Sequence, residues 1–358
     1  MPTSTTVSMV FELLGGSTAL ALVKMLHDSS LTYAGLINTE KAFSVILAIF
    51  MSVAIAFVFG LLVQWLARVV FTFHYTKHLK YTIGIFGGLS VTAIAYFLLV
   101  NGLGSASFMT DEVKAWIASH TGEILVGFLI GFTVLMQVLH WCKVNVFRLI
   151  VLFGTFSLAM AFAGNDLVNF IGVLLAGYSS FLDFSAHPGA NPSTFMMDSL
   201  NGPADTPFYF LVAAGLVMTV ALVTSKKAQN VVKTSVDLSR QTAGNEMFGS
   251  SRFARRLVRS VLNSNEFIVE HTPKPVKRWI NSRFNQDEAI IPNGAAFDLV
   301  RASVNLVLAG LLIVVGTSLK LPLSTTYVAF MVGMGSSLAD RAWGRESAVF
   351  RVTGVISV

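Results

Sequence analysis

The sequence predicts an all-α polytopic membrane protein. Of its 358 residues, 54% are hydrophobic and only 12% are charged, a composition typical of membrane proteins rather than soluble domains. The apolar residues form runs of about 20, the length that a helix needs to cross a bilayer. The charged residues gather between these runs, so the net charge of +6 indicates basic loops rather than a nucleic-acid surface, and we expect no nucleic-acid partner.

Six apolar runs predict spanning helices, near residues 42–66, 81–103, 124–140, 149–181, 208–224 and 302–319. We expect the run 149–181 to be interrupted, because glycines loosen it beside a polar motif at its centre. Two further apolar stretches, near 7–26 and 324–339, each follow a Pro-x-Ser-Thr-Thr sequence. These two stretches are ambiguous between full spans and re-entrant hairpins.

Loop charges predict the orientation in an inner (plasma) membrane. The loop 182–207 has three aspartates and no Lys or Arg, and the loop 104–123 is net acidic. The segment 225–301 has thirteen Lys or Arg against seven Asp or Glu. The positive-inside rule therefore places 225–301 in the cytoplasm, with 67–80 and 141–148.

The basic segment also contains a predicted amphipathic helix, within the sequence "SSRFARRLVRSVLN". Apolar and arginine side chains fall mostly on different faces of that helix, so it could lie on the lipids of the inner leaflet. A solvated linker helix is the alternative, and neither interpretation bears on chemistry.

A repeated motif is the strongest sign of internal organisation. Residues 2–6 are "PTSTT" and residues 322–326 are "PLSTT", and at the same offset Gly15 matches Gly335. Duplicated motifs suggest structural repeats with a substrate site at their interface. Because nothing but Met1 precedes the first copy, we expect the chain to be an internal piece of a longer transporter, cut at both ends. The alternative is a short protein that works as a homodimer or with a partner chain.

The motif itself predicts an anion site. Proline suits the start of a helix, and the hydroxyls that follow lie beside the free N–H groups of the first turn, which favour negative charge. An ordinary Ser/Thr cap is the alternative, but duplication favours a functional site. The predicted anion-binding hydroxyls are Ser4, Thr5, Thr6, Ser324, Thr325 and Thr326.

The second motif, "GNDLVN", places a carboxylate inside an apolar run. A bare carboxylate at the bilayer centre costs about 3 kcal/mol or more. On a helix, Asn165, Asp166 and Asn169 share one patch, and their oxygen atoms suit a hard cation. We therefore predict Asp166, Asn165 and Asn169 as cation ligands. The alternative is an ion pair between Asp166 and a neighbouring basic residue, but the spans contain hardly any Lys or Arg.

A cation between the two motifs would reconcile an anion cradle with a nearby aspartate. It would neutralise Asp166 and attract the anion, so that each ion binds well only with the other. Such reciprocal linkage is the thermodynamic requirement of a symporter.

The two motifs together resemble those of the inorganic phosphate transporter family PiT (Pho4-like). The matching residues are "GNDLVN", the later "PLSTTYV" and the duplicate "PTSTTVS", although the usual Ala between Gly and Asn is missing. The resemblance implies an inverted-repeat secondary transporter with broken helices and re-entrant hairpins, and Na⁺- or H⁺-coupled phosphate symport. It also implies that the six hydroxyls named above bind phosphate, as do Asn165 and Asn169, and that Asp166, Asn165 and Asn169 bind the cation. The Asn-Asp motif of the first repeat has no counterpart here.

This interpretation divides the chain into five parts. Residues 1–26 end the first repeat, 27–148 hold connecting helices, 149–224 begin the second repeat, 225–301 are the basic cytoplasmic segment, and 302–358 are the truncated second Pro-x-Ser-Thr-Thr half. We expect no enzyme activity, no cofactor and no metal beyond the coupling cation. Alternatives are a permease for sulfate or another tetrahedral oxyanion, an intramembrane lipid-phosphate enzyme, and a structural membrane subunit.

Three further features of the sequence bear on function. Glu12 follows the first motif by two helical turns and could relay protons or face a vestibule. His74 and His78 have helical spacing, but they flank Lys77 in a basic loop, so we do not expect a metal site. Asp298 and Arg301, at the start of a span, are predicted to form a local ion pair.

Overall fold

The computed structural model describes residues 4–97, 110–192, 195–197, 206–241, 251–256, 258–259, 273–292, 295–319, 321 and 323–357. Within these ranges all regular elements are helical. In chain order they are α1 (Thr5–His27), α2 (Tyr33–Leu36), α3 (Thr39–Phe71), η1 (Tyr75–His78), α4 (Leu79–Phe97), α5 (Asp111–Ser119), α6 (Thr121–Trp141), α7 (Val146–Ala186), α8 (Phe208–Thr224), α9 (Lys226–Leu238), α11 (Lys274–Arg283), η4 (Gln286–Glu288), α12 (Leu299–Ser318), α13 (Thr325–Ala339) and α14 (Arg345–Ser357).

Five of these helices are long and apolar enough to cross a membrane, namely α1, α3, α6, α7 and α12. A sixth span is possible if α8 and α9, which meet at 67°, count as one broken span or a re-entrant loop. This confirms an all-α chain with several candidate membrane spans. Of the predicted run 81–103, the part beyond Phe97 lies outside the described residues. The predicted inverted repeat, re-entrant hairpins and five-part division stay predictions.

The predicted interruption of the run 149–181 is wrong. Helix α7 runs for 41 residues without a break, and Gly164 and Gly172 lie inside it. An internal glycine costs a helix about 1 kcal/mol, whereas breaking the helix in hydrocarbon would leave several backbone groups without partners. The polar groups of the motif are instead satisfied by side chains, as described below.

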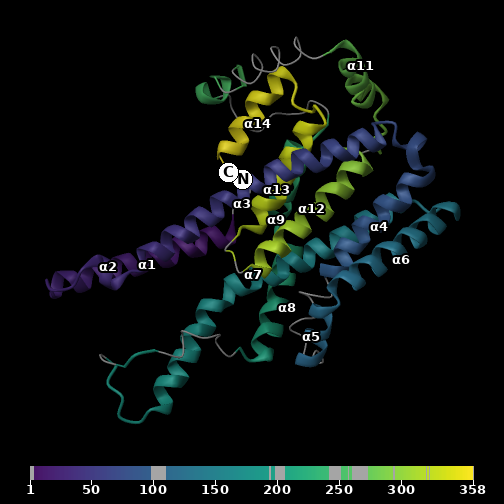
Figure 1. Cartoon of the computed structure of the whole chain (residues 1–358). Helices are drawn as coiled ribbons and strands as arrows, with labels where there is room; N and C mark the ends of the chain where they lie inside the picture. Colours follow the sequence, from purple (N-terminus) through teal and green to yellow (C-terminus); the bar gives the residue numbers. More distant parts are fainter. Residues whose placement is uncertain are drawn as a thin grey trace.

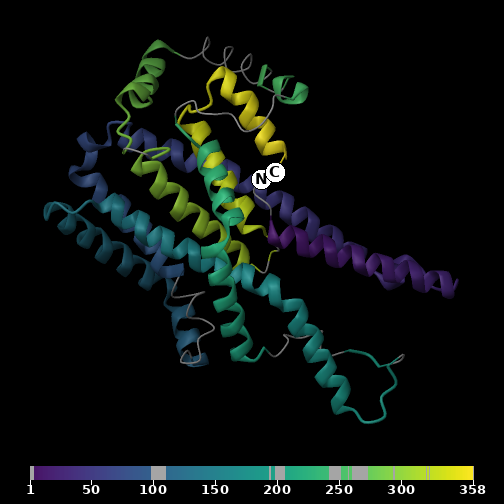
Figure 2. The same cartoon turned by 180° about the vertical axis from the view of Figure 1, so that it is seen from behind.

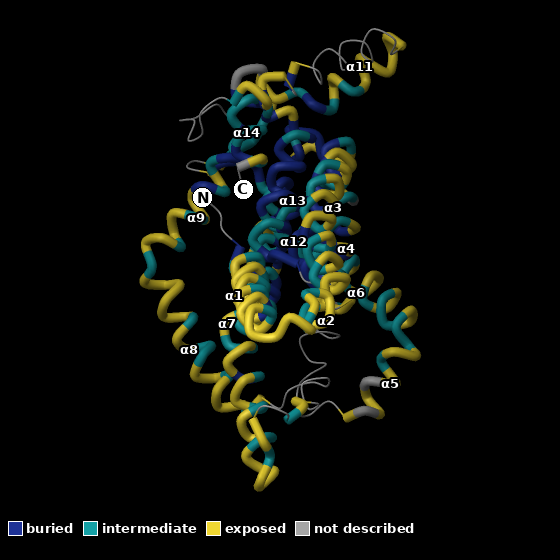
Figure 3. Tube along the Cα trace, turned by 90° about the vertical axis from the view of Figure 1, so that its left-hand side faces the viewer, coloured by how far each residue is buried: buried dark blue, intermediate teal, exposed yellow. Residues whose placement is uncertain are grey.

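The buried core lies where α3, α12 and α13 pack together, while α1 and α8 remain largely exposed (Figure 3). Glycines let α3 and α13 approach closely. A Cβ at Gly60 would lie 2.6 Å from the carbonyl oxygen of Val332, and one at Gly335 would collide with the carbonyl oxygen of Phe57. These contacts hold α13 rigidly along its length, so its first turn has a defined position.

A second cluster joins the α4–α6 hairpin to α7 and to η1 (Figure 1). Phe71, Tyr75 and Phe86 surround Phe147 with ring centroids 5.3–5.7 Å apart. This aromatic contact fixes the turn between α6 and α7 against the end of α3.

The end of α13 that is distant from its first turn lies in a buried ionic network. Arg68 of α3 donates to Asp298 Oδ2 (2.7 Å) and, through Nε, to Asp340 Oδ1 (2.9 Å). Gln64 also donates to Asp340 Oδ1, at 2.9 Å. All four side chains are almost completely buried, so the network ties α3, the start of α12 and the end of α13 together.

The predicted local ion pair between Asp298 and Arg301 is wrong. Asp298 caps α12 by accepting from the backbone N–H of Arg301 at 3.0 Å, and its carboxylate pairs with Arg68. The Arg301 guanidinium lies 3.7 Å from Asp340 instead. The fork of donors on the Arg68 guanidinium binds both carboxylates, those of Asp298 and Asp340, at once. A local pair between Asp298 and Arg301 would bind only one of them. Burial, and then the charge of Asp298, raise the pKa of the nearby Tyr75 phenol in η1.

Candidate functional site

The candidate site forms where the first turns of α1 and α13 meet the middle of α7. In the chain, the first turns of α1 and α13 each lie about 160 residues from the middle of α7, yet their side chains hydrogen-bond to it. Seen from both sides, α7 passes below α13 and the start of α1 (Figures 1 and 2). The structure therefore brings the Ser-Thr-Thr residues of both repeated motifs and the Gly-Asn-Asp motif to one place.

Asp166 is the centre of this cluster. Its Oδ1 atom accepts from the hydroxyl of Thr5 at 3.2 Å, from the hydroxyl of Thr325 at 3.0 Å and from the amide of Asn165 at 3.2 Å. Thr5 and Thr325 occupy the same position in the two copies of the repeated motif. The two copies thus make equivalent contacts with one carboxylate oxygen.

The other oxygen, Asp166 Oδ2, accepts no hydrogen bond within the described part of the chain. Nor does any Lys or Arg described here lie within ion-pair distance of Asp166. The alternative that Asp166 is held by a basic neighbour is therefore not supported in these ranges. Neutral donors stabilise the carboxylate, and one of its oxygens remains open to a further ligand.

The two asparagines converge on Thr6, the last residue of the first motif copy. The amide nitrogen of Asn169 donates to Thr6 Oγ1 at 2.7 Å, and that of Asn165 donates to the same atom at 3.4 Å. Both amide groups use their nitrogen atoms in these contacts. In the described ranges neither Oδ1 atom accepts a hydrogen bond, so each can accept one from a ligand.

The serines of the two motifs cap the helices. Ser4 Oγ accepts from the N–H of Val7 at 3.0 Å, and Ser324 Oγ accepts from the N–H of Tyr327 at 3.1 Å. Both serines are buried. The ordinary capping alternative thus holds for them, and each hydroxyl still has a hydrogen to donate. Thr326 is half-buried and is the one predicted ligand with no hydrogen bond in the described structure.

Two helix N-termini face the cluster, and each contributes a partial positive charge of roughly half a unit. One full negative charge, on Asp166, lies between them. A carboxylate in this position receives the stabilisation that an external anion would receive. Asp166 therefore lies where two helix ends and three side-chain donors favour a negative charge, which explains how a carboxylate is tolerated in an apolar run.

The other residues that the sequence singles out do not contact this cluster. Glu12 is exposed on α1, beyond the first turn. Within the described ranges, no three His, Cys, Asp or Glu side chains gather as a metal site would require. The predicted amphipathic helix at 250–263 lies partly outside the described residues.

Sequence reasoning missed the ionic network at the other end of α13. It placed Arg68 in a basic loop and did not consider Asp340, yet both are buried. The sequence offers one sign that Arg68 is buried. Three apolar residues precede Arg68, and three more separate it from the polar residues that begin at Thr72.

Comparison with protein-family models, with curated proteins and with solved structures found no match to this chain.

Proposed function

We propose that the chain carries out cation-coupled symport of inorganic phosphate, with Na⁺ or H⁺ as the coupling ion. One observation carries the proposal: Thr5 and Thr325, at equivalent positions of a duplicated motif, both donate to Asp166 Oδ1. Two anion-binding helix ends that share a carboxylate are expected of a site that must exchange an internal anion for an external one.

The exchange begins with the cation. Na⁺ binds oxygen ligands, and Asp166 Oδ2 together with the asparagine Oδ1 atoms would supply them. A proton on Asp166 would have the same effect on charge. In either case the negative charge of Asp166 is neutralised without the two threonine hydroxyls, so these become free to donate to an incoming anion.

The anion then takes the place of the carboxylate at the two helix ends. Thr5, Thr325 and Thr6 would donate hydroxyl hydrogens to its oxygens, with the free N–H groups of both first turns nearby. The charge of the cation attracts the anion, and the anion stabilises the cation. Each ion thus raises the affinity of the other by the same factor, which couples their movement.

The free acceptors favour phosphate over sulfate. Near neutral pH phosphate carries at least one proton that it can donate, whereas sulfate carries none. Asn165 Oδ1 and Asn169 Oδ1 lie beside the cradle as acceptors without hydrogen bonds in the described structure. A site that offers acceptors to a bound oxyanion discriminates in favour of the one that can donate, because phosphate can give these acceptors a hydrogen bond and sulfate cannot.

The test is binding and uptake of labelled phosphate by the purified chain, in detergent and in proteoliposomes, with Na⁺ or with choline. We expect binding that requires the cation and that falls at least tenfold in Asp166→Asn. The matched control is Asp183→Asn, which removes a carboxylate from the exposed end of the same helix and should change nothing. Unaltered cation-dependent binding in Asp166→Asn would reject the mechanism, and equal competition by sulfate would reject the preference for phosphate.

A further inference from the structure

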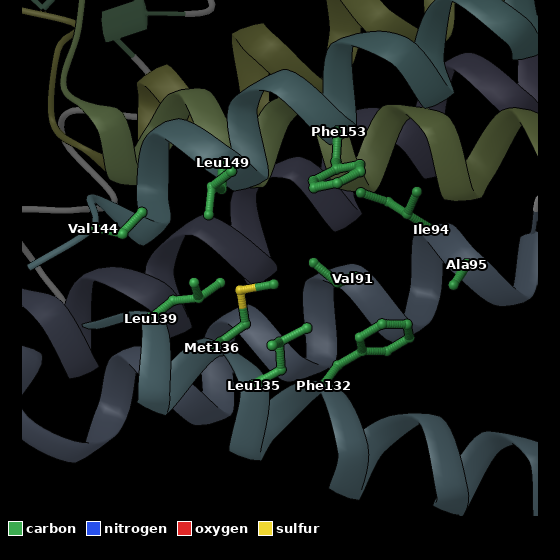
Figure 4. Close-up of a pocket in the computed structure, with 10 residues that line it drawn as sticks. All are labelled: Val91, Ile94, Ala95, Phe132, Leu135, Met136, Leu139, Val144, Leu149 and Phe153. Carbon is green, nitrogen blue, oxygen red and sulfur yellow. The ribbon is translucent and has the colours of Figure 1, made fainter. Parts of the chain in front are cut away.

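An apolar groove lies between α4, α6 and α7, away from the candidate site (Figure 4). Its volume is about 490 Å³, within the range of about 300–1,000 Å³ found for ligand pockets. Its wall is entirely apolar, and it includes Val91 and Ile94 of α4, Phe132 and Met136 of α6, and Leu149 and Phe153 of α7.

The wall restricts what can fill this groove. It offers no hydrogen-bonding atom, so a peptide segment placed there would leave its backbone N–H and C=O groups without partners. A hydrocarbon chain has no such groups. The three helices belong to the apolar part of the chain. The hydrocarbon that would reach them is therefore the acyl chain of a membrane lipid.

The end of the groove at Val144 and Leu149 is cationic. Lys143 and Arg148 are the immediate sequence neighbours of these two lining residues, and both are exposed. The adjoining segment 72–80, held against this turn by the contact of Tyr75 with Phe147, contains Lys77 and Lys80. Neither 72–80 nor 141–148 contains an Asp or Glu, so this end complements an anionic headgroup.

The backbone at Lys143 supports the same conclusion. Lys143 N–H donates to His140 O and Val144 N–H donates to Leu139 O, both at 3.0 Å. This is a Schellman turn, in which the left-handed position is usually a glycine. Here it is Lys143, with φ of 63°, a conformation that strains any residue with a Cβ. The chain thus keeps a cation at the mouth of the groove where glycine would be more stable.

We propose that this groove binds an anionic phospholipid, with an acyl chain along α4, α6 and α7 and the headgroup phosphate at Lys143 and Arg148. Trp141 is exposed beside them, as aromatic residues are at the level of lipid headgroups. The loop belongs to the side that the sequence predicts to be cytoplasmic, where anionic lipids are concentrated.

The experiment counts lipids bound to the delipidated chain by native mass spectrometry, during titration with phosphatidylglycerol or phosphatidylcholine. We expect one retained phosphatidylglycerol and a clear preference over phosphatidylcholine. The preference should fall about fivefold for each cation removed in Lys143→Gly and in Lys143→Gly with Arg148→Gln. Lys143→Gly should also raise the melting temperature, because it removes the strain, so lost binding could not be attributed to unfolding.

Two further variants separate the groove from general surface charge. Ala95→Trp, which fills the groove, should abolish retention of both lipids. Lys226→Gln with Lys227→Gln removes two exposed cations from α9 on the same predicted side and should leave binding unchanged. Equal binding of the two lipids to the unaltered chain, or retained lipid in a folded Ala95→Trp variant, would overturn the proposal.

Discussion

The two ends of α13 hold a carboxylate in opposite ways. At its first turn, Asp166 of α7 is half-buried and is bound by neutral hydroxyl and amide donors, with one oxygen open. At its last turn, Asp340 is completely buried and shared between Arg68, Gln64 and Arg301. Neutral donors can be exchanged for other partners at modest cost, whereas a buried ion pair cannot be opened without leaving a bare charge.

Within one helix, this difference separates an end that is anchored by buried ion pairs from an end whose contacts are with neutral donors. The ionic network fixes the far end of α13 to α3 and α12. Close packing against α3 holds the rest of α13 in place. The first turn is then presented to Asp166 by a rigid support, which is what a binding site needs. The following changes test each part of that division.

The largest effect is expected at the anchored end. Arg68→Ala should lower the free energy of unfolding by about 3–5 kcal/mol, because it leaves two buried carboxylates without their main partner. Thermal or denaturant unfolding in detergent would measure this. Arg148→Ala, which removes an exposed arginine, is the control and should cost little. A normal melting temperature in Arg68→Ala would show that the network does not hold α13.

The packing between α3 and α13 should give an intermediate effect. Gly335→Ala places a methyl group against the backbone of Phe57, and overpacking of this kind costs about 1–3 kcal/mol. The matching position in the first repeat is Gly15, where a Cβ meets nothing within 4 Å. Gly15→Ala should therefore stabilise α1 by up to about 1 kcal/mol. Equal effects of the two substitutions on unfolding would contradict the asymmetry between the repeats.

The exchangeable end should show the smallest effect on stability. Thr325→Val removes one of three donors to Asp166 Oδ1, and a single hydrogen bond contributes about 0.5–1.5 kcal/mol. If the proposed function is correct, phosphate binding should fall much more than stability does. Thr326→Val is the matched control, because Thr326 forms no hydrogen bond in the described structure. Parallel losses in both variants would indicate that the position of the hydroxyl is unimportant.

Local features of the chain were predictable. The apolar runs set the helices because the length and composition of a span depend only on neighbouring residues. The helix starts at Thr5 and Thr325 follow from the serine before each, which caps its own helix through a contact three residues away. The grouping of Asn165, Asp166 and Asn169 on one patch follows from helical spacing alone.

Glycines were a poor guide where tertiary packing decides. Gly164 suggested a break, yet α7 is continuous, because the polar side chains beside it find partners on other helices. Gly335 and Gly15 are equivalent in the sequence, but one touches a neighbouring backbone and the other touches nothing. The same residue type therefore has different consequences that depend on what packs against it.

By itself, the sequence determined that this chain is an all-α protein with apolar spans, where the predicted spans begin to within about three residues, and which polar residues share a face. Only the tertiary structure decided that both threonines reach the same oxygen of Asp166 and that Arg68 joins Asp298 to Asp340. The physical reason is range. Hydropathy and capping act within a few residues, but these contacts join side chains 159 to 272 positions apart, and their formation depends on which helices pack together.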